Sequence, residues 1–518
     1  MAGDELRPEV LHLTNHTKNF EEYRISVFAP GPANGEHPLG ATGNLAGTAV
    51  WGLKSADGSV FPAEQIKILR GVQVKDSEGA QRGLCFDPLT ELADGIISVP
   101  AGGTGLLWLN FDSANVKPGI YKGVLRIVPL SQNLTTVNAS KLQYDGRWQD
   151  FPLSVEVLDF KLPETPAIPM GVFSTPFNEN MFKEMVKLGV RDLHFEPWQF
   201  VISFNKDGSI SKFNTERAGK NIRQILAWAE KYQVRDQCRI MLCYSFYPHF
   251  LNRWVAGKFK PGSPEWRRAW KESLLAVDGF FRSHGLDNKH YAIELWDEPP
   301  PAQYEQLLLA SSAAKEFAPQ IRLMVTFDAR RLPVEKLAKL RKKIDIWNFW
   351  GKSYFTGSGY KELVEQLRQD GSEIAYYTCS TALRLNLNDY YRMHGHWSYA
   401  QNLGMTSIYQ YIDAPHNYSG IANWRKVSSG GMAYLAGEKV VSSIRLECFR
   451  LGHTDIKYFR LLEDLLKANP NHPAAAAAEE FLQNEPLANA LHYQFDINRP
   501  EESRRKCIEF IKQIKEKK

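Results

Sequence analysis

The sequence predicts a β-sandwich followed by a (β/α)8 TIM barrel, with C-terminal helices after the barrel. Three observations predict this order. Residues 1–160 contain short apolar runs separated by Gly, Pro, Asn and Asp clusters, residues 170–440 alternate short apolar runs with longer amphipathic stretches, and residues 441–518 show helical patterns. Of the 518 residues, 43% are hydrophobic and 23% charged, which excludes a disordered, collagen-like or coiled-coil chain.

Charge and cysteine usage exclude several kinds of partner and cofactor. A formal net charge of +5 is weak for this length and gives no support to binding of nucleic acid or an anionic membrane. The six cysteines are scattered without a CxxC pair, so neither a zinc site nor a disulfide framework is expected. HExxH and Walker A motifs are missing too, and we expect no metal and no cofactor. No run is long and apolar enough for a membrane span, and the first residues, MAGDELRPEV, do not resemble a signal peptide.

Residues 1–160 predict an antiparallel β-sandwich. Runs such as GTAVWGL, QIKILRGVQV and GIYKGVLRIVPL are short and rich in β-branched residues, and turn-forming residues separate them. The following segment, 161–169 (KLPETPAIP), contains three prolines and is predicted to be a linker.

Eight candidate strands, each followed by a helix or by room for one, predict the barrel over residues 170–440. The strands are Ile168–Phe173, Val190–Phe195, Cys238–Phe246, His290–Trp296, Ile321–Phe327, Ile344–Phe349, Glu373–Thr378 and Met405–Tyr411. Helices are expected at Thr215–Tyr232, Pro264–Ser283, Gln303–Phe317 and Tyr360–Gln369. A doubly wound open sheet is the alternative. The first strand has no GxGxxG turn after it, which favours the barrel.

Residues 441–518 predict helices packed on the barrel. A long helix is expected over Ser443–Ala468, an Ala-rich helix near Pro473–Gln483 and a basic helix at the C-terminus. Ion pairs on the surface of the long helix are expected from four of its charged residues, Arg445, Glu447, Arg450 and Asp455.

Two adjacent carboxylates end the fourth candidate strand, in the sequence HYAIELWDEPP. Active sites of (β/α)8 barrels lie at the C-terminal ends of the strands, so Asp297 and Glu298 are candidate catalytic residues. Alternation along the strand directs Glu294, Trp296 and Glu298 into the barrel, whereas Asp297 needs strand twist or a β-bulge to join them. The structural alternative is an acidic helix N-terminus, because Pro299–Pro301 can open a helix.

The second candidate strand has a similar polar face. Asp192, His194 and Glu196 point inward, while Leu193 and Phe195 point outward. Polar strand ends predict a polar cleft, although a single histidine such as His194 is more often a hydrogen-bonded structural residue. Aromatic residues make up 12% of the chain, and some of these rings are expected to stack on sugar faces.

Paired carboxylates among aromatic rings at a barrel mouth predict cleavage of a glycosidic bond. One carboxylic acid must protonate the leaving oxygen, so its pKa has to be raised. A neighbouring ionised carboxylate raises it, because two adjacent acids resist being charged together. The pair is therefore expected to titrate as a coupled unit.

The chain resembles glycoside hydrolase family 123 and its DUF4091-type relatives. The motifs that carry the resemblance are VEVLDFKLPE at the end of the sandwich, WDEP at the fourth strand and SSIRLECFRLGHTDIKYFRLLE in the C-terminal region. GIYKGVLRIVPL, AYYTCS and YYRMHGHW are similar as well. The resemblance extends from about residue 95 to 468, most of the chain.

This resemblance implies a retaining β-N-acetylgalactosaminidase that uses substrate-assisted catalysis through an oxazoline-type intermediate. Glu298 would be the general acid/base. Asp297 would orient the 2-acetamido group while its carbonyl oxygen attacks the anomeric carbon. The partner would be a glycan or glycoconjugate with a terminal β-linked N-acetylhexosamine, and a periplasmic or extracellular location in a bacterium would follow from that substrate class.

Such a pocket needs aromatic walls and a hydroxyl or indole donor near the acetamido carbonyl. Besides His194 and Glu196, the candidates for binding substrate are Trp198, Tyr244, Trp350, Tyr377, Tyr409, Tyr411 and Trp424. After the eighth strand the family resemblance leads us to expect a Trp-rich strand end, but this sequence has SIYQYIDAPHNYSGIANW there. Trp424, in the loop that follows, is expected to take the place of that strand-end tryptophan.

Two other functions remain open. One is a glycosidase for another hexosamine or neutral glycan, in which Asp297, Glu196 or Asp413 acts as a covalent nucleophile. The other is a carbohydrate-binding protein without turnover. The intact Asp297–Glu298 pair argues against this last function, because a protein that only binds sugar has no need of a coupled acid pair.

Overall fold

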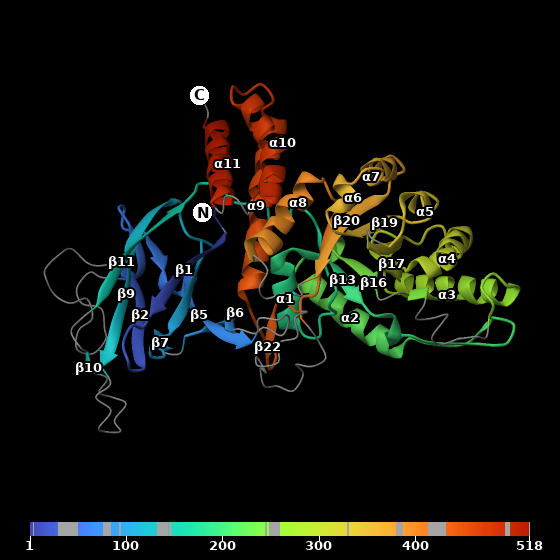
Figure 1. Cartoon of the computed structure of the whole chain (residues 1–518), viewed down its shortest axis with the longest axis horizontal. Helices are drawn as coiled ribbons and strands as arrows, with labels where there is room; N and C mark the ends of the chain where they lie inside the picture. Colours follow the sequence, from blue (N-terminus) through green and yellow to red (C-terminus); the bar gives the residue numbers. More distant parts are fainter. Residues whose placement is uncertain are drawn as a thin grey trace.

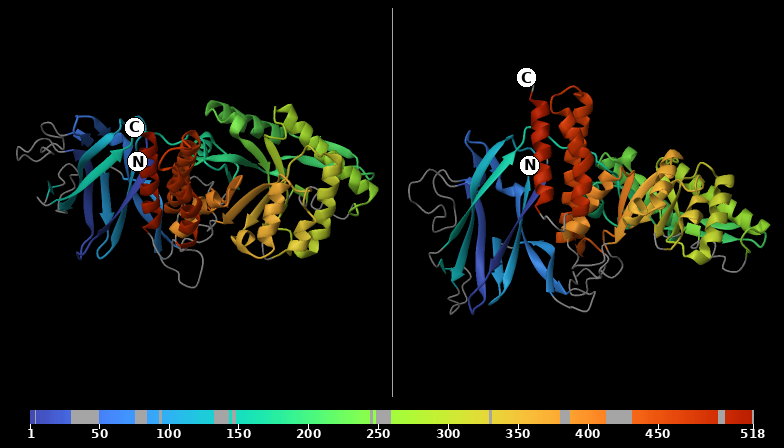
Figure 2. Two further views of the ribbon diagram at one scale, coloured as in Figure 1. Left: turned by 90° about the horizontal axis from the view of Figure 1, so that it is seen from above. Right: turned by 45° about the horizontal axis from the view of Figure 1, so that its top comes forward.

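The computed structural model describes residues 1–3, 5–29, 50–75, 84–92, 95–131, 143–144, 148–243, 246–247, 259–328, 331–379, 387–412, 431–492 and 498–516. An antiparallel sandwich, a closed parallel barrel and C-terminal helices follow one another along the chain. This confirms the fold class predicted from the sequence. In Figure 1 and in both views of Figure 2, the C-terminal helices lie between the sandwich and the barrel, and the two chain ends lie close together.

Two antiparallel sheets form the sandwich. Their strands are β1 (Leu6–Thr14), β2 (Glu21–Ala29), β3 (Val50–Ser55), β4 (Val60–Pro62), β5 (Ile66–Lys75), β6 (Leu84–Glu91), β7 (Ile96–Val99), β8 (Thr104–Asp112), β9 (Gly119–Ser131), β10 (Gln143–Tyr144) and β11 (Gln149–Val157). One sheet has the order β1-β8-β5-β6, and the other the order β10-β9-β2-β3-β4, with β11 beside β9 and β7 beside β2. Buried side chains from both sheets, such as Leu53, Phe61 and Leu107, fill the space between them.

Eight parallel strands close the barrel in sequence order. They are β12 (Met170–Val172), β13 (Val190–Phe195), β16 (Arg239–Leu242), β17 (Tyr291–Asp297), β18 (Leu323–Asp328), β19 (Ile346–Trp350), β20 (Glu373–Cys379) and β21 (Met405–Tyr409). Each predicted strand corresponds to one of these, with ends shifted by a few residues. A hairpin of β14 (Val201–Phe204) and β15 (Ile210–Asn214) follows the second barrel strand, and β22 (Tyr434–Ala436) pairs with β23 (Lys439–Val441) after the last.

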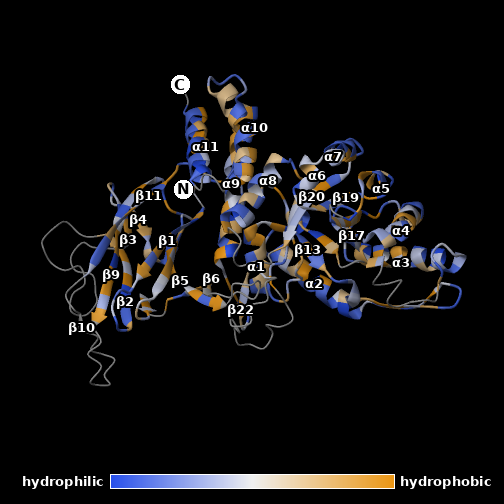
Figure 3. Ribbon diagram, viewed as in Figure 1, coloured by the Kyte–Doolittle hydropathy of each residue, from blue (hydrophilic) through white to orange (hydrophobic). Residues whose placement is uncertain are grey.

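The helices cover the outside of the barrel and fill the junction with the sandwich. They are α1 (Glu179–Leu188), α2 (Glu216–Lys231), α3 (Pro264–Ser283), α4 (Tyr304–Phe317), α5 (Val334–Ala338), α6 (Ser353–Thr356), α7 (Tyr360–Gln369), α8 (Met393–Ala400), α9 (Ile444–Ala468), α10 (Ala475–His492) and α11 (Arg499–Lys515). Hydrophilic and hydrophobic residues alternate along α3 and α4 in Figure 3, as expected for helices with one buried face.

Helix α9 contacts the sandwich as well as the barrel helices, and this changes the interpretation of its charged residues. Arg445 is fully buried and pairs with Asp87 of β6 at 2.9 Å, and Asp455 is also buried. The expectation that these two residues form ion pairs on the helix surface is therefore wrong. Glu447 and Arg450 do pair with each other one turn apart, but Glu447 is buried, so this ion pair is not on the helix surface either.

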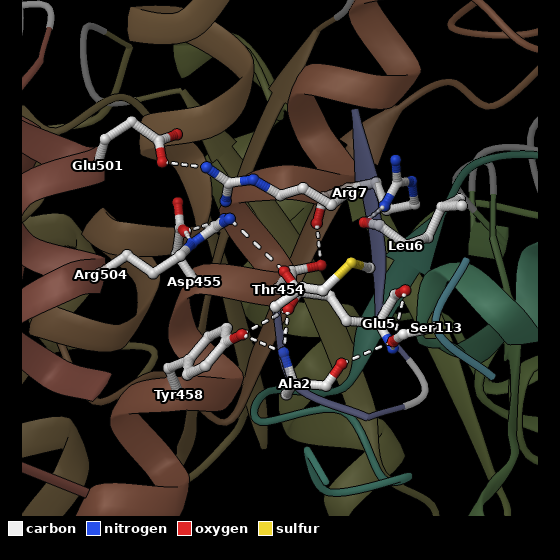
Figure 4. A network of polar contacts seen from close by, with 12 residues as sticks. Ala2, Glu5, Leu6, Arg7, Ser113, Thr454, Asp455, Tyr458, Glu501 and Arg504 are labelled. Atoms are coloured by element: carbon white, nitrogen blue, oxygen red, sulfur yellow. Dashed lines mark hydrogen bonds and ion pairs between the residues drawn. The ribbon is translucent and has the colours of Figure 1, made fainter. Parts of the chain in front are cut away.

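A buried polar network joins the N-terminal strand to the C-terminal helices (Figure 4). Asp455 accepts hydrogen bonds from Arg392 at 2.8 Å and from Arg504 of α11 at 2.6 Å. Glu5, just before β1, accepts a hydrogen bond from Tyr458 of α9 and lies 3.5 Å from Arg504. All five side chains are less than a tenth exposed, so this junction network is shielded from solvent.

All six cysteines lie in the described residues, and none of them forms a disulfide. Among the residues that the structure describes, no three or more His, Cys, Asp and Glu side chains are grouped so that they could hold a metal ion. No helix in this described part is both long enough and apolar enough to cross a membrane.

Candidate active site

A β-bulge in β17 decides where the paired carboxylates point. Glu294 and Trp296 pair with consecutive residues of β18, so Leu295 is the extra residue of the bulge. A bulge shifts the alternation of side chains by one position. Asp297 therefore lies on the inward face at the end of the strand. Of the two ways considered from the sequence, strand twist and a β-bulge, the structure has the bulge.

The same bulge turns Trp296 away from the barrel interior. Its ring stacks on Tyr247 with centroids 4.8 Å apart, and its indole N–H donates to Gln303 at 2.9 Å. Trp296 belongs to the apolar core between the strands and the outer helices. The prediction that Trp296 points into the barrel is wrong, because regular alternation does not hold across the bulge.

Thr326 of the neighbouring strand β18 holds both acidic residues. Its hydroxyl donates to Asp297 Oδ1 at 2.7 Å, and it accepts the backbone N–H of Glu298 at 3.2 Å. The Thr326 carbonyl accepts the same N–H at 3.1 Å. Below the pair, the buried Glu294 places Oε1 3.3 Å from the Thr326 hydroxyl. One hydroxyl thus fixes the Asp297 side chain and the Glu298 backbone relative to each other.

Glu298 has a left-handed backbone conformation and two side-chain partners. Its φ of 41° is unusual for a residue other than glycine and marks local strain, which is common at functional sites. Tyr377 of β20 donates a hydrogen bond to Oε1, and Arg331 lies 3.2 Å from Oε2. Arg331 also donates to the Glu298 carbonyl oxygen at 2.9 Å. These contacts hold a partly exposed carboxylate in a defined orientation.

Asp297 and Tyr377, which both adjoin Glu298, have raised pKa values. Burial raises the pKa of Asp297, the hydrogen bond from Thr326 opposes this rise, and the neighbouring Glu298 adds to it. Burial and the hydrogen bond to Glu298 raise the pKa of Tyr377, so this phenol stays protonated and remains a donor. A raised pKa at Asp297 next to Glu298 is the direction expected for one of two adjacent carboxylates.

Three of the predicted substrate-binding aromatics lie with the carboxylates at the barrel mouth. Phe173, at the end of β12, packs against Tyr377 and Tyr409 with centroid distances of 6.2 and 6.0 Å. Trp350 is partly buried against the same apolar cluster of the barrel interior. Tyr377, Tyr409 and Trp350 therefore surround the floor of the mouth, and one of them binds Glu298 directly.

Two other predicted binding residues lie elsewhere. His194 is 1% exposed inside the barrel, where it packs against Phe173 and lines a cavity of only about 20 Å³, and burial lowers its pKa to about 3. Tyr411 is 1% exposed in the core outside the barrel. His194 is therefore closed to a sugar, and Tyr411 lines a different pocket together with residues of the sandwich and α9, so neither assignment to the mouth holds. His194 is on the inward face, as predicted, but too deep for the mouth.

Glu196 and Trp198 line a second pocket of about 280 Å³, beside the mouth. They follow β13, and Trp198 is 40% exposed. The remaining candidates, Tyr244, Asp413 and Trp424, fall outside the described residues.

Thr326 and Arg331 were missed by reasoning from the sequence. The fifth strand reads MVTFDARR, and alternation from Met324 places Thr326 and Asp328 on the inward face. Thr326 could therefore have been found by the signal used for the second strand, namely polar residues on the inward face. Arg331 follows the strand in a turn, and its contact with Glu298 depends on loop geometry that alternation does not encode.

Comparison with solved structures gives a match over nearly the whole chain. A family 123 glycoside hydrolase from Clostridium perfringens, described in terms of glycolipid glycan hydrolysis, superposes with a TM-score of 0.69 over 99% of this chain and 94% of that chain, at 14% identity. The chain has the fold of a family 123 glycoside hydrolase. The family resemblance seen in the sequence is thus confirmed for the fold.

An endo-1,4-β-mannanase from Rhizomucor miehei gives a weaker match, with a TM-score of 0.37 over 57% of this chain and 94% of that chain, at 12% identity. Comparison of the sequence with protein-family models gives no match, and a search of the curated proteins gives none either. The family 123 fold therefore rests on the three-dimensional comparison.

Proposed function

We propose that the protein is a retaining glycoside hydrolase that releases β-linked N-acetylgalactosamine by substrate-assisted catalysis. The arrangement of the consecutive residues Asp297 and Glu298 at the end of β17, both held by Thr326, carries this proposal. The family 123 fold supports glycosidase activity. The strained backbone of Glu298 and its ordered carboxylate support a role for this residue in the chemistry.

The position of the two acids favours the acetamido group of the substrate as nucleophile. An enzymic nucleophile and an acid act from opposite sides of the scissile bond, with their carboxyl groups roughly 5–5.5 Å apart in retaining enzymes. Asp297 and Glu298 are adjacent in sequence and are held by the same residue, Thr326. They therefore approach a sugar from one side and leave the opposite face to the acetamido oxygen.

In the first step, the acetamido carbonyl oxygen forms a bond to the anomeric carbon while the glycosidic C–O bond breaks. Glu298 transfers its proton to the leaving oxygen. Asp297 accepts the acetamido N–H and stabilises the positive charge of the oxazolinium ring. In the second step, Glu298 takes a proton from water, whose oxygen attacks the anomeric carbon and reopens the ring. Two inversions retain the β configuration.

The other residues of the mouth position these groups. Tyr377 and Arg331 orient the carboxylate of Glu298. Trp350 and Tyr409 provide aromatic surface next to Phe173 for the apolar face of a pyranose.

Replacement of Glu298 by Gln tests the proposed function. Glu298→Gln should reduce kcat for an aryl 2-acetamido-2-deoxy-β-galactoside by about 100-fold or more, the usual scale for a general acid. Glu305→Gln, at an exposed glutamate of α4, is the matched control and should behave like wild type. Wild-type turnover by Glu298→Gln would refute the assignment.

An N-acetylgalactosamine thiazoline distinguishes the two kinds of nucleophile. It mimics the cyclised intermediate and should inhibit competitively. Covalent labelling by a 2-fluoro sugar, combined with no inhibition by the thiazoline, would instead show an enzymic nucleophile and overturn the substrate-assisted route.

A further inference from the structure

A second pocket opens beside the candidate active site, at the ends of β12, β13 and β21 next to α2. Its volume is about 280 Å³, near the lower limit of small-molecule sites, which start at roughly 300 Å³. Phe173, which packs against Tyr377 and Tyr409 at the floor of the mouth, also lines this pocket. Phe173 therefore connects this pocket to Tyr377, the ring that binds Glu298.

The lining of this pocket combines apolar surface with amide and carboxylate groups. Phe173, Ile225 and Trp228 contribute apolar surface. Polar groups come from side chains that can both donate and accept, among them Ser174, Gln199, Asn221, Gln224 and Gln410. Such a mixture suits a pyranose, which has an apolar face and a rim of hydroxyl groups.

Part of this polar rim is ordered in advance. Asn221 donates to Gln199 at 2.8 Å, and Glu196 is hydrogen-bonded to Trp198. The Arg217 guanidinium lies over the Trp198 ring, 4.0 Å from its centroid. Binding a ligand here costs less ordering of side chains than binding at a bare surface would.

The charges of the pocket select a neutral ligand. Arg217 and Glu196 interact electrostatically, so the cation is already offset by a carboxylate. Burial raises the pKa of Glu196, and the Trp198 hydrogen bond and Arg217 oppose this rise. A uronate or sulfated sugar placed in the pocket would bring a second negative charge against Glu196, and among the described lining residues Arg217 is the one cation.

We propose that this pocket is a second sugar subsite that binds one neutral pyranose of the leaving glycan. The inference rests on the proposed function, because it places the cleaved linkage at Glu298 and the next sugars toward Trp198. In this arrangement Trp198 supplies a stacking face, and the amides recognise hydroxyl groups.

The subsite predicts that the response to substrate length depends on Trp198. The probes are an aryl β-N-acetylgalactosaminide and an oligosaccharide in which N-acetylgalactosamine is β-linked to neutral galactose residues. Trp198→Ala should lower kcat/KM for the oligosaccharide about tenfold more than for the aryl glycoside, a change of about 1.4 kcal/mol expected for one lost stacking contact. The matched control is Trp148→Ala, since Trp148 is an exposed tryptophan of the sandwich that also carries an arginine, Arg126, over its ring.

Two oligosaccharides that differ in the charge of the leaving sugar test whether the pocket selects a neutral ligand. Wild type should prefer the oligosaccharide with neutral leaving sugars over one in which the terminal N-acetylgalactosamine is β-linked to glucuronate. Glu196→Gln should reduce that preference, because it leaves Arg217 uncompensated. Equal use of both oligosaccharides by wild type would overturn the selection of a neutral sugar.

The outcomes separate the subsite from the proposed function. If wild type hydrolyses neither the aryl glycoside nor the oligosaccharide, the proposed function fails and the subsite with it. If wild type hydrolyses both and Trp198→Ala changes their kcat/KM values by the same factor, the subsite alone is refuted. A selective loss for the oligosaccharide in Trp198→Ala, absent in Trp148→Ala, supports both.

Discussion

The barrel mouth and the junction network both bring carboxylates close to arginine, yet the two regions differ in solvent exposure and in the direction of their pKa shifts. Asp455 in the junction is 1% exposed, and burial alone would raise its pKa, but Arg392 and His396 hold it below its usual range. At the mouth, Asp297 is exposed on one side, and burial of the rest raises its pKa because Thr326 is a weaker partner than a cation.

This difference separates stability from chemistry. A carboxylate whose pKa is lowered on folding stabilises the folded state at neutral pH, and one whose pKa is raised destabilises it there. The junction therefore contributes to the free energy of unfolding, whereas the mouth keeps an acid in an unfavourable environment. Retention of such a destabilised group at the mouth is typical of residues with a functional role.

The largest expected effect is the loss of a junction carboxylate. Asp455→Asn removes the buried carboxylate that Arg392 and Arg504 share, so that Arg392 keeps only Glu501 and Arg504 only Glu5 as an acidic partner. The substitution should reduce the free energy of unfolding by about 3–5 kcal/mol. Urea unfolding followed by circular dichroism measures this change. Asp464→Asn is the matched control on the same helix. Asp464 also pairs with a basic residue, Lys467 at 3.7 Å, but it is 56% exposed, so the loss of its charge should have little effect. An Asp455→Asn variant as stable as the control would show that the network is not needed for stability.

The pH dependence of the Asp455 effect has a definite sign. Its folded pKa is lowered, so its contribution is present above the unfolded pKa of an aspartate, about 3.9, and is lost as the pH falls through the folded value. The stability difference between wild type and Asp455→Asn should therefore shrink below about pH 4. A difference that grows on acidification would contradict the lowered pKa.

Asp297→Asn should show the opposite combination of properties. Its kcat/KM for an aryl N-acetylgalactosaminide should fall by about 100-fold, because the acetamido group loses the carboxylate that orients it. Its kcat/KM for a plain galactoside, which has no acetamido group, should fall by a smaller factor. The melting temperature at pH 7 should equal or exceed that of wild type, and this gain should vanish as the pH falls below the raised pKa of Asp297. Equal losses for both substrates, or a lower melting temperature, would contradict the assigned role.

Features that a regular residue pattern encodes could be predicted from the sequence, and local departures from that pattern could not. The eight strands, and the place of Asp297 and Glu298 at the end of the fourth, were predictable, because short apolar runs that alternate with amphipathic stretches distinguish strands from helices. A β-bulge was one of the two ways considered to turn Asp297 inward, but its position at Leu295 was not predictable, because one extra residue leaves no compositional signal. Trp296 was consequently assigned to the wrong face.

Contacts between segments far apart in the sequence were also beyond prediction. Arg445 pairs with Asp87, which lies 358 residues earlier, so the helical spacing of Arg445 contains no information about its partner. Tyr377 was one of several aromatic candidates for binding substrate, and its hydrogen bond to Glu298, 79 residues earlier, could not be read from the spacing of either residue.

The smallest expected effect concerns Thr326, which joins the two acids. Thr326→Val keeps the shape of the side chain and removes the hydroxyl. The backbone carbonyl of residue 326 still accepts the Glu298 N–H, so kcat should fall by only about tenfold. The hydrogen bond from Thr326 lowers the pKa of Asp297, so its loss should move the acidic limb of the pH–kcat/KM profile to higher pH. Thr326→Ser restores the donor and should restore the wild-type limb. A lower kcat with an unshifted limb in Thr326→Val would mean that Thr326 acts only through packing, because a structural role alone has no effect on the titration of Asp297.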